Sequence, residues 1–268
     1  MTGWEIAGLL ALGSLTGFLA GLFGIGGGMI MVPFLTLLLT AHRLPVEHVV
    51  HMAIATSLAT ILFTSISSVR AHHQRGAVMW PVARVLAPGI LVGALLGAQL
   101  AAALPTAGLA VLFALFVGFS ATQMLLNRKP KPTRELPGRA GMFGVGNVIG
   151  LLSSLVGAGG AFVSVPFMVW CNVTMHRAVA TSSALGFPIA AAGTLGYVIA
   201  GWRELGPPDW QFAGFIYLPA LALISAMSVL TAPLGAKVAH AIDVARLKRW
   251  FALLLYLLAA YMLRKAFG

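Results

Sequence analysis

Stretches of about 20 apolar residues recur along the whole 268-residue chain, and short polar breaks separate them. An α-helix of that length crosses a hydrocarbon core of roughly 30 Å, whereas the strands of a membrane β-barrel alternate apolar and polar residues over about ten positions. Only 9% of the residues are charged, against about 25% in an ordinary soluble domain. The sequence therefore predicts an all-α polytopic membrane protein. It excludes a water-soluble globule, because too few polar side chains are present to cover one.

Two glycine-rich segments match one another at a constant offset of 133 residues. Residues 17–34 read GFLAGLFGIGGGMIMVPF, and residues 150–167 read GLLSSLVGAGGAFVSVPF. Further on, HMAIATS at 51–57 matches HRAVATS at 176–182. Internal similarity of this kind indicates duplication of one structural unit. The predicted organisation is a first transmembrane repeat at 1–126, a basic cytoplasmic linker at 127–140 and a second transmembrane repeat at 141–268.

Each half contains four hydrophobic segments, and glycines interrupt the first of the four. The predicted segments are 6–41, 49–69, 85–104 and 106–126 in the first half, and 142–169, 178–200, 212–238 and 244–263 in the second. The linker is charged and rich in proline, so it cannot span a membrane. It therefore joins the two halves on one face.

The relative orientation of the halves depends on whether the glycine-broken segment returns on itself or crosses the membrane once. Cytoplasmic loops of membrane proteins are enriched in Lys and Arg. A returning segment places thirteen of the seventeen Lys and Arg residues on the cytoplasmic side, whereas a single crossing places eleven there. The counts favour inverted repeats, with parallel repeats as the alternative. The net charge of +11 is then explained by retention beside anionic lipid, and no nucleic-acid partner is predicted.

The first glycine cluster interrupts an apolar helix at residues 24–28. Glycine costs about 1 kcal/mol in a helix interior, and a break within the membrane is tolerated where the backbone is buried in protein or lines a cavity. The helix is expected to restart at Met29, with Pro33 near its first turn, where a missing N–H does little harm. A helix N-terminus inside the membrane, with free N–H groups and the positive dipole end, can bind an anion.

The broken helices supply the first candidate substrate-binding residues, which are Gly26, Gly27, Gly28, Gly159 and Gly160. The alternative is that these glycines only allow helices to approach closely. Hydroxyl side chains early in the second helix of each half could donate hydrogen bonds to the same anion; these candidates are Thr56, Ser57, Thr181 and Ser182. Helix packing, or bonding to a carbonyl of the same helix, is the alternative for the hydroxyls.

Two histidines, His51 and His176, align between the halves and could carry a coupling proton. The alternative is an interface position near a helix end. No metal site is predicted, because His51 and His73 bracket one span of about 22 residues, roughly 33 Å of helix, and cannot share an ion. All six acids lie at segment ends or in loops, which argues against a cation pathway built on buried carboxylates. No other cofactor is predicted either.

The paired motifs resemble those of the TauE/SafE sulfite exporter family, also called the toluene-sulfonate uptake permease group. The resemblance rests on residues 24–33 and 157–166 and on the Ala-Thr-Ser sequences at 55–57 and 180–182, and it extends over essentially the whole chain. The second motif differs from the pattern, with Ala158 and Ala161 in place of Ile25 and Gly28. The resemblance implies a multi-pass plasma-membrane protein that moves small sulfur-containing or organic anions such as sulfite or sulfonates.

The leading hypothesis is a secondary transporter that holds a small anion at two broken helices and works by alternating access. Its partners would be the lipid bilayer and a coupling proton or ion. An enzyme is not expected: residues 47–51 read EHVVH rather than the H-E-x-x-H of zinc proteases, and no G-x-S-x-G elbow occurs. The alternative is a membrane scaffold or assembly factor without transport activity, which would not explain the duplicated glycine break.

Overall fold

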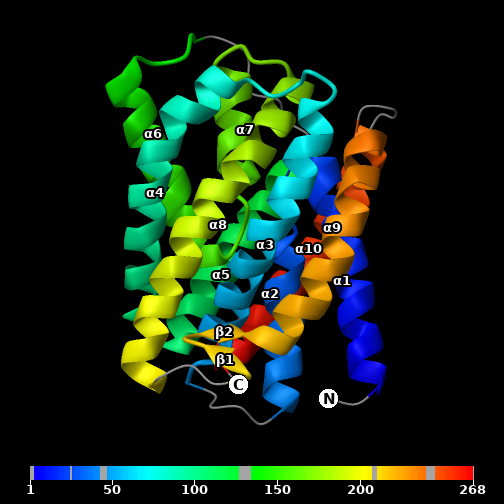
Figure 1. Ribbon diagram of the computed structural model, residues 1–268, viewed down its shortest axis with the longest axis vertical. Helices are drawn as coiled ribbons and strands as arrows, with labels where there is room; N and C mark the ends of the chain where they lie inside the picture. The colour runs from blue at the N-terminus through cyan, green and yellow to red at the C-terminus, as the bar shows by residue number, and fades with distance from the viewer. Residues whose placement is uncertain are drawn as a thin grey trace.

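The computed structural model describes residues 3–24, 26–42, 47–126, 134–206, 210–239 and 245–267. These residues form ten helices and one short hairpin (Figure 1). The first half contains α1 (Gly3–Phe23), α2 (Gly28–Ala41), α3 (Val49–His73), α4 (Trp80–Ala102) and α5 (Thr106–Leu126). The second half contains α6 (Arg139–Val156), α7 (Ala161–Trp170), α8 (Met175–Leu205), β1 (Phe212–Ala213), β2 (Ile216–Tyr217), α9 (Leu218–Ala239) and α10 (Ala245–Phe267). Residues 127–133 of the predicted linker lie outside the described residues.

Eight of these helices are long and apolar enough to cross a membrane. The predicted polytopic helical membrane protein is thereby confirmed. The glycine interruptions also fall where they were expected, since α1 and α2 are separated at residues 24–27 and α6 and α7 at residues 157–160. The division of the chain into repeat, linker and repeat stays a prediction.

The predicted apolar segment at 212–238 is wrong at its start. Phe212–Tyr217 forms an antiparallel hairpin, in which Phe212 pairs with Tyr217, rather than the first turns of a helix. Gly214 has a φ of 60°, a left-handed conformation that glycine adopts without strain. Helix α9 begins only at Leu218, immediately before Pro219, a residue that suits a first helical turn. Apolar composition alone cannot distinguish these two backbone conformations.

The expectation for Pro33 is also wrong. Helix α2 begins at Gly28, so Pro33 and its repeat counterpart Pro166 in α7 both lie inside their helices. Proline has no N–H, and therefore the carbonyl groups of Met29 and Phe162, four residues earlier, lose their intrahelical partners. Both short helices carry this interruption at the same position relative to their start.

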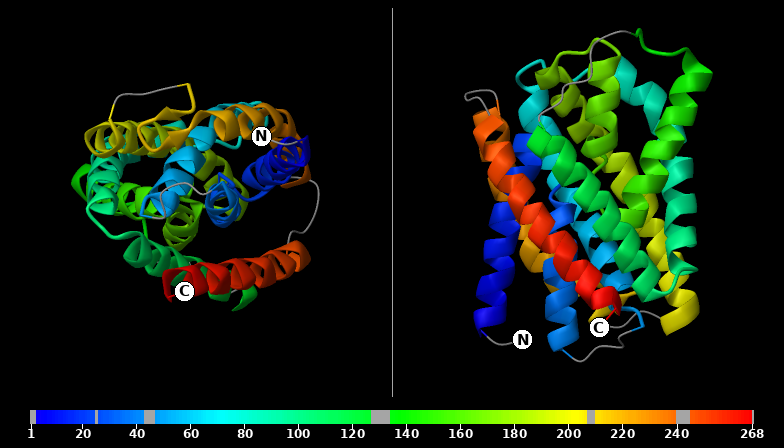
Figure 2. Two further views of the ribbon diagram at one scale, coloured as in Figure 1. Left: turned by 90° about the horizontal axis from the view of Figure 1, so that it is seen from below. Right: turned by 180° about the vertical axis from the view of Figure 1, so that it is seen from behind.

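The two halves interleave instead of forming separate bundles. Helix α1 packs along α9 and α6 along α4, so the first helix of each half lies against a long helix of the other. Helices α3 and α8 pack against each other, and each also contacts a long helix of the opposite half, α9 and α4 respectively. Helices α5 and α10 pack together on one side of the molecule (Figure 2). Of the eight long helices, α3 is the most deeply buried.

Corresponding helices of the halves run in opposite directions along the long axis. Helix α1 starts at the lower end in Figure 1 and α6 at the upper end, while α2 and α7 turn back toward those same ends. The start of α1 and the end of α10 both lie at the lower end. These directions agree with a returning glycine-broken segment. The inverted-repeat relation itself stays a prediction.

Glycines allow the interleaved helices to approach one another closely. The face of α4 that packs on α6 carries glycine at one-turn intervals, at Gly89, Gly93 and Gly97. A Cβ atom on Gly93 would lie 2.0 Å from the carbonyl oxygen of Asn147, and one on Gly150 would lie 2.3 Å from that of Ile90. In lipid, where apolar side chains gain little from leaving the solvent, such close van der Waals packing holds helices together.

We expect Gly93→Val to destabilise the protein by about 1–3 kcal/mol, because the added atoms overlap the backbone of α6. Gly118→Val in α5 is the matched control, since nothing lies within 4 Å of a Cβ atom built there. Thermal unfolding of the two purified variants in detergent measures the difference. Equal melting temperatures would show that the α4–α6 contact is not close-packed.

We expect a reporter inserted into the linker at 127–140 to be cytoplasmic and a reporter fused after residue 268 to be on the outer face. The physical reason is the positive-inside rule applied to the helix directions. Of the Lys and Arg side chains in the described helices, Arg203, Arg264 and Lys265 lie in the last turns of α8 and α10, at the end opposite the start of α6. Paired fusions to alkaline phosphatase and a fluorescent protein measure both positions. A cytoplasmic C-terminal reporter would exclude returning segments in both halves.

Candidate functional site

The two glycine breaks touch each other inside the bundle. A Cβ atom on Gly28 would lie 1.8 Å from the carbonyl oxygen of Gly157, and one on Gly26 would lie 3.1 Å from the Cα of Gly159. Segments more than 100 residues apart in the sequence therefore meet backbone to backbone. A side chain at Gly28 would prevent this contact, so close packing is one demonstrable role of that glycine.

The breaks also start two helices in the protein interior. Gly27 and Gly160 are the N-cap residues of α2 and α7, with φ values of 77° and 80° in the left-handed region. Their carbonyl oxygens accept the first helical hydrogen bonds, from the N–H groups of Met31 and Ser164. Neither N-cap residue forms a side-chain cap. The first N–H groups of an α-helix have no intrahelical acceptor, so both helices begin with donors directed at the paired breaks.

Hydrogen bonds from Ser57 and Ser182 connect each break to a helix of the other half. Ser57 Oγ in α3 donates to the carbonyl oxygen of Gly157 at 3.0 Å, and Ser182 Oγ in α8 donates to that of Gly24 at 3.5 Å. The two serines are repeat counterparts, as are the two glycines, so the contacts form a symmetric pair. Both serines are completely buried. In this conformation both serine hydroxyl groups donate their hydrogens to backbone carbonyl oxygens of the breaks.

Thr56 and Thr181 form a second symmetric pair. Thr56 Oγ1 accepts a hydrogen bond from the N–H of Tyr217 at 2.9 Å, and Thr181 Oγ1 accepts one from the N–H of Met79 at 3.0 Å. Tyr217 immediately precedes α9 and Met79 immediately precedes α4. Each threonine therefore anchors the start of a long helix that belongs to the opposite half. Their assignment as substrate ligands stays a prediction.

A small pocket lies beside the first break, and we call it the hydroxyl pocket after four of its side chains; Ala20, Ile61 and Gly186 also line it. It is lined by the backbone of the break and by four hydroxyl side chains; these lining residues include Gly24, Gly26, Thr64, Ser65, Ser68 and Ser183. Its volume of about 10 Å³ corresponds to roughly one water-sized sphere. All four hydroxyl side chains are buried. Among them, only the Oγ of Ser68 has no hydrogen-bond partner.

The sequence prediction did not include the three pocket hydroxyls of α3, which are Thr64, Ser65 and Ser68. A signal was present in α3, where hydroxyl residues recur every fourth position at Thr56, Thr60, Thr64 and Ser68. Residues four apart lie on the same face of a helix. The spacing therefore indicates a stripe of hydroxyl groups along one face of α3. Sequence spacing alone could not show that this face meets the glycine break.

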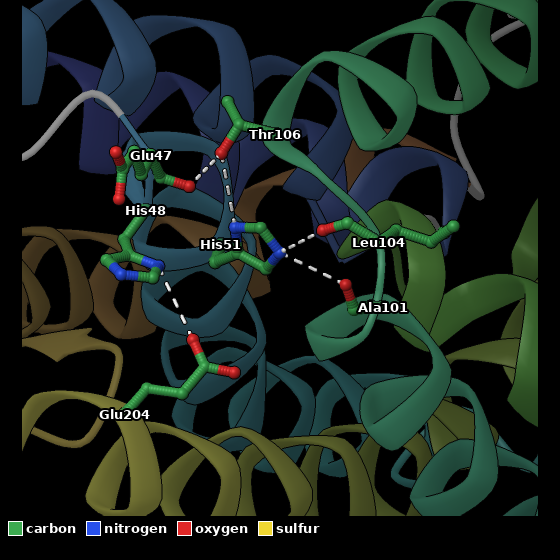
Figure 3. Close-up of polar contacts among 7 residues, drawn as sticks. All are labelled: Glu47, His48, His51, Ala101, Leu104, Thr106 and Glu204. Atoms are coloured by element: carbon green, nitrogen blue, oxygen red, sulfur yellow. Dashed lines mark hydrogen bonds and ion pairs between the residues drawn. The ribbon is translucent and has the colours of Figure 1, made fainter.

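His51 and His176 are not brought together, because α3 begins at the lower end in Figure 1 and α8 at the upper end. His51 is buried, and its Nε2 donates to the carbonyl oxygens of Ala101 and Leu104 at 3.0 and 3.1 Å (Figure 3). Carbonyl groups at a helix end lack intrahelical donors, so His51 caps the end of α4. His176 is exposed in the first turn of α8.

Further contacts between histidine and carboxylate side chains join helices at the lower end. His48 Nδ1 lies 3.5 Å from Glu204 Oε2 at the end of α8 (Figure 3), and His42 Nε2 lies 3.3 Å from Glu5 Oε1 in α1. Phe215 of the hairpin packs against the ring of His48 with centroids 5.5 Å apart. In the described part of the chain, no three His, Cys, Asp or Glu side chains are grouped so that they could hold a metal ion.

The fold and this site define a class of protein: a helical, multi-pass membrane protein made of two matching halves whose broken helices meet inside the bundle. The family described as "Sulfite exporter TauE/SafE" matches residues 9–262. The chain therefore belongs to the TauE/SafE family, which confirms the resemblance seen in the sequence.

Relatives from several organisms match the chain, and each of the three that follow is named a "Probable membrane transporter protein". The protein from Haemophilus influenzae is 36% identical over 258 residues, which cover 96% of this chain and 97% of that protein. MJ0441 of Methanocaldococcus jannaschii is 27% identical and covers 95% and 94%. YdhB of Bacillus subtilis is 29% identical and covers 71% and 78%. No solved structure matches the chain.

We expect Thr56→Val to destabilise the protein by about 1–3 kcal/mol, because it leaves the buried N–H of Tyr217 without an acceptor. Thr181→Val should act similarly through Met79. Serine at either position keeps the hydroxyl oxygen and is the matched control, so it should cost clearly less. Thermal unfolding in detergent compares the four variants. If valine and serine were equally tolerated, the two threonines would not anchor these helices.

Proposed function

We propose that this protein is a secondary transporter that moves small anions across the plasma membrane by alternating access. The observation that carries the proposal is the meeting of the two glycine breaks, where α2 and α7 both begin inside the bundle. A helix N-terminus attracts negative charge through its free N–H groups and its dipole. Paired broken helices of this kind form the substrate sites of several secondary transporters. The names of the relatives support membrane transport.

The distribution of acidic side chains supports an anionic substrate. Within the described helices, carboxylates occur only in the first turn of α1, at Glu5, and in the last turn of α8, at Glu204. The interior beside the first break instead contains hydroxyl groups, which can donate hydrogen bonds to an anion. A cation pathway would require buried carboxylates or comparable acceptors. Sulfite is the substrate that the family description names, and an organosulfonate is the further substrate that the sequence resemblance implies.

Alternating access would change the contact between the two breaks. Because this contact is made largely by glycine backbone, the segments could separate without disrupting interlocked side chains. Ser57 and Ser182, which bridge the breaks to the opposite half, would then exchange partners during transport. His51 and His176 are the proposed carriers of a coupling proton, with His51 Nδ1 facing Thr106 Oγ1 at 3.4 Å.

Purified protein in liposomes should take up radiolabelled sulfite or methanesulfonate faster than protein-free liposomes do. We expect Ser57→Ala and Ser182→Ala to lower the initial rate several-fold, because each removes a bridge between a break and the opposite half. Ser120→Ala is the matched control: its buried hydroxyl donates to the carbonyl oxygen of Phe116 in its own helix, and the rate should be unchanged.

Two outcomes would contradict different parts of this proposal. Equal uptake rates in Ser57→Ala, Ser182→Ala and Ser120→Ala would show that the paired breaks do not take part in transport. If the folded wild-type protein moved no anion in either direction, the transport assignment would fail and the scaffold alternative would be favoured.

A further inference from the structure

The four hydroxyl groups of the hydroxyl pocket have no polar counterparts in the other half. Helices α3 and α8 correspond at an offset of 125 residues, as the matched stretches at 51–57 and 176–182 show. At this offset Thr64, Ser65 and Ser68 correspond to Ile189, Ala190 and Gly193, and Ser183 corresponds to Leu58. Each pocket hydroxyl is therefore replaced by a residue without a polar side chain at the equivalent position.

Aliphatic side chains fill the equivalent space beside the second break. A Cβ atom on Gly160 would lie 2.5 Å from Ile189 Cδ1, and one on Gly193 would lie 2.9 Å from Leu58 Cδ1. Ser153 Oγ, 3.1 Å from the same position on Gly160, adds one hydroxyl, which is buried and has no hydrogen-bond partner either. The space beside the first break is therefore lined by four hydroxyl side chains together with Ile61, whereas the space beside the second is lined mainly by aliphatic side chains and by the one hydroxyl of Ser153.

Ser68 gives the hydroxyl pocket an unused hydrogen-bond donor. Its side chain is 2% exposed and its Oγ has no partner, and leaving a buried polar group unpaired is unfavourable. The other three hydroxyls donate to carbonyl oxygens of their own helices, those of Thr60, Leu62 and Val179. A bound acceptor could satisfy Ser68 directly and compete with those carbonyls for the remaining three donors.

The lining of the hydroxyl pocket carries no charged side chain. His72, one turn beyond Ser68, donates its Nε2–H to the carbonyl oxygen of Gly21 at 3.0 Å and is not part of the lining. Arg70 is exposed. Neutral donors would therefore have to replace the hydration shell of a bound anion. The Born cost of removing an ion from water grows with the square of its charge, so a dianion loses about four times as much as a monoanion.

We infer that the hydroxyl pocket at the first break is a single substrate site that selects oxyanions carrying one negative charge. The inference rests on the proposed function and narrows it: a singly charged sulfonate binds, whereas doubly charged sulfate is rejected. Gly26 links this site to the transport cycle, because it lines the pocket and also contacts Gly159 of the second break. Separation of the two breaks would widen the pocket beyond its present size.

Equilibrium binding of radiolabelled methanesulfonate to the purified full chain tests the site, with unlabelled sulfate as competitor at constant ionic strength. We expect wild-type protein to bind methanesulfonate and sulfate to compete poorly. Ser68→Ala should weaken methanesulfonate binding about tenfold or more, because a donor to a charged acceptor is lost. The matched control is Ser67→Ala, whose hydroxyl donates to the carbonyl oxygen of Val229 and does not line the pocket; its affinity should equal that of wild type.

Each alternative result is decisive. Sulfate that competes as well as unlabelled methanesulfonate would overturn the charge selectivity, and equal affinities of Ser68→Ala and Ser67→Ala would overturn the pocket. If Ser68→Ala does not yield folded protein, Ser183→Ala tests the same pocket from α8 with the same expectation. Binding without uptake into liposomes would leave the pocket in place and refute transport. Uptake that is unchanged in both Ser68→Ala and Ser183→Ala would refute the pocket and leave the transport assignment standing.

Discussion

The backbone contact between Gly28 and Gly157 is the constraint on which the interior of this protein depends. A broken helix in a membrane needs its backbone covered by protein, and here each break covers the other. The contact requires that no side chain stand between the segments, which glycine alone permits. Ser57 and Ser182 donate hydrogen bonds to the carbonyl oxygens of the breaks, and both serine side chains are buried in the protein interior.

The two halves share matched framework contacts but differ in the side chains beside their breaks. The framework contacts come in matched pairs, as in the bonds of Thr56 and Thr181 to the segments that precede α9 and α4. The interior surfaces differ, because Thr64 and Ser68 of α3 are matched by Ile189 and Gly193 in α8. Backbone geometry can thus be shared by both halves while the polarity beside each break is set separately by a few side chains.

Several features were predictable because they depend on short stretches of chain. Apolar length indicated the spans, and the glycine clusters indicated where α1 and α6 end. The failures were local too: apolar composition did not distinguish the hairpin at Phe212–Tyr217 from a helix, and Pro33 was placed too near a helix start. The contact of Thr56 was beyond prediction, since its partner Tyr217 lies 161 residues away.

The sequence by itself determined a duplicated, helical membrane protein with two glycine-broken segments, because hydrophobic length and the backbone preferences of glycine are properties of the local chain. Only the tertiary structure decided which hydroxyl groups bond to backbone and which line a pocket. That outcome depends on which distant segments become neighbours and on the space left between them. Four hydroxyl groups, among them the unpartnered Ser68, line the space beside the first break, whereas Ile189 and the single hydroxyl of Ser153 occupy the space beside the second.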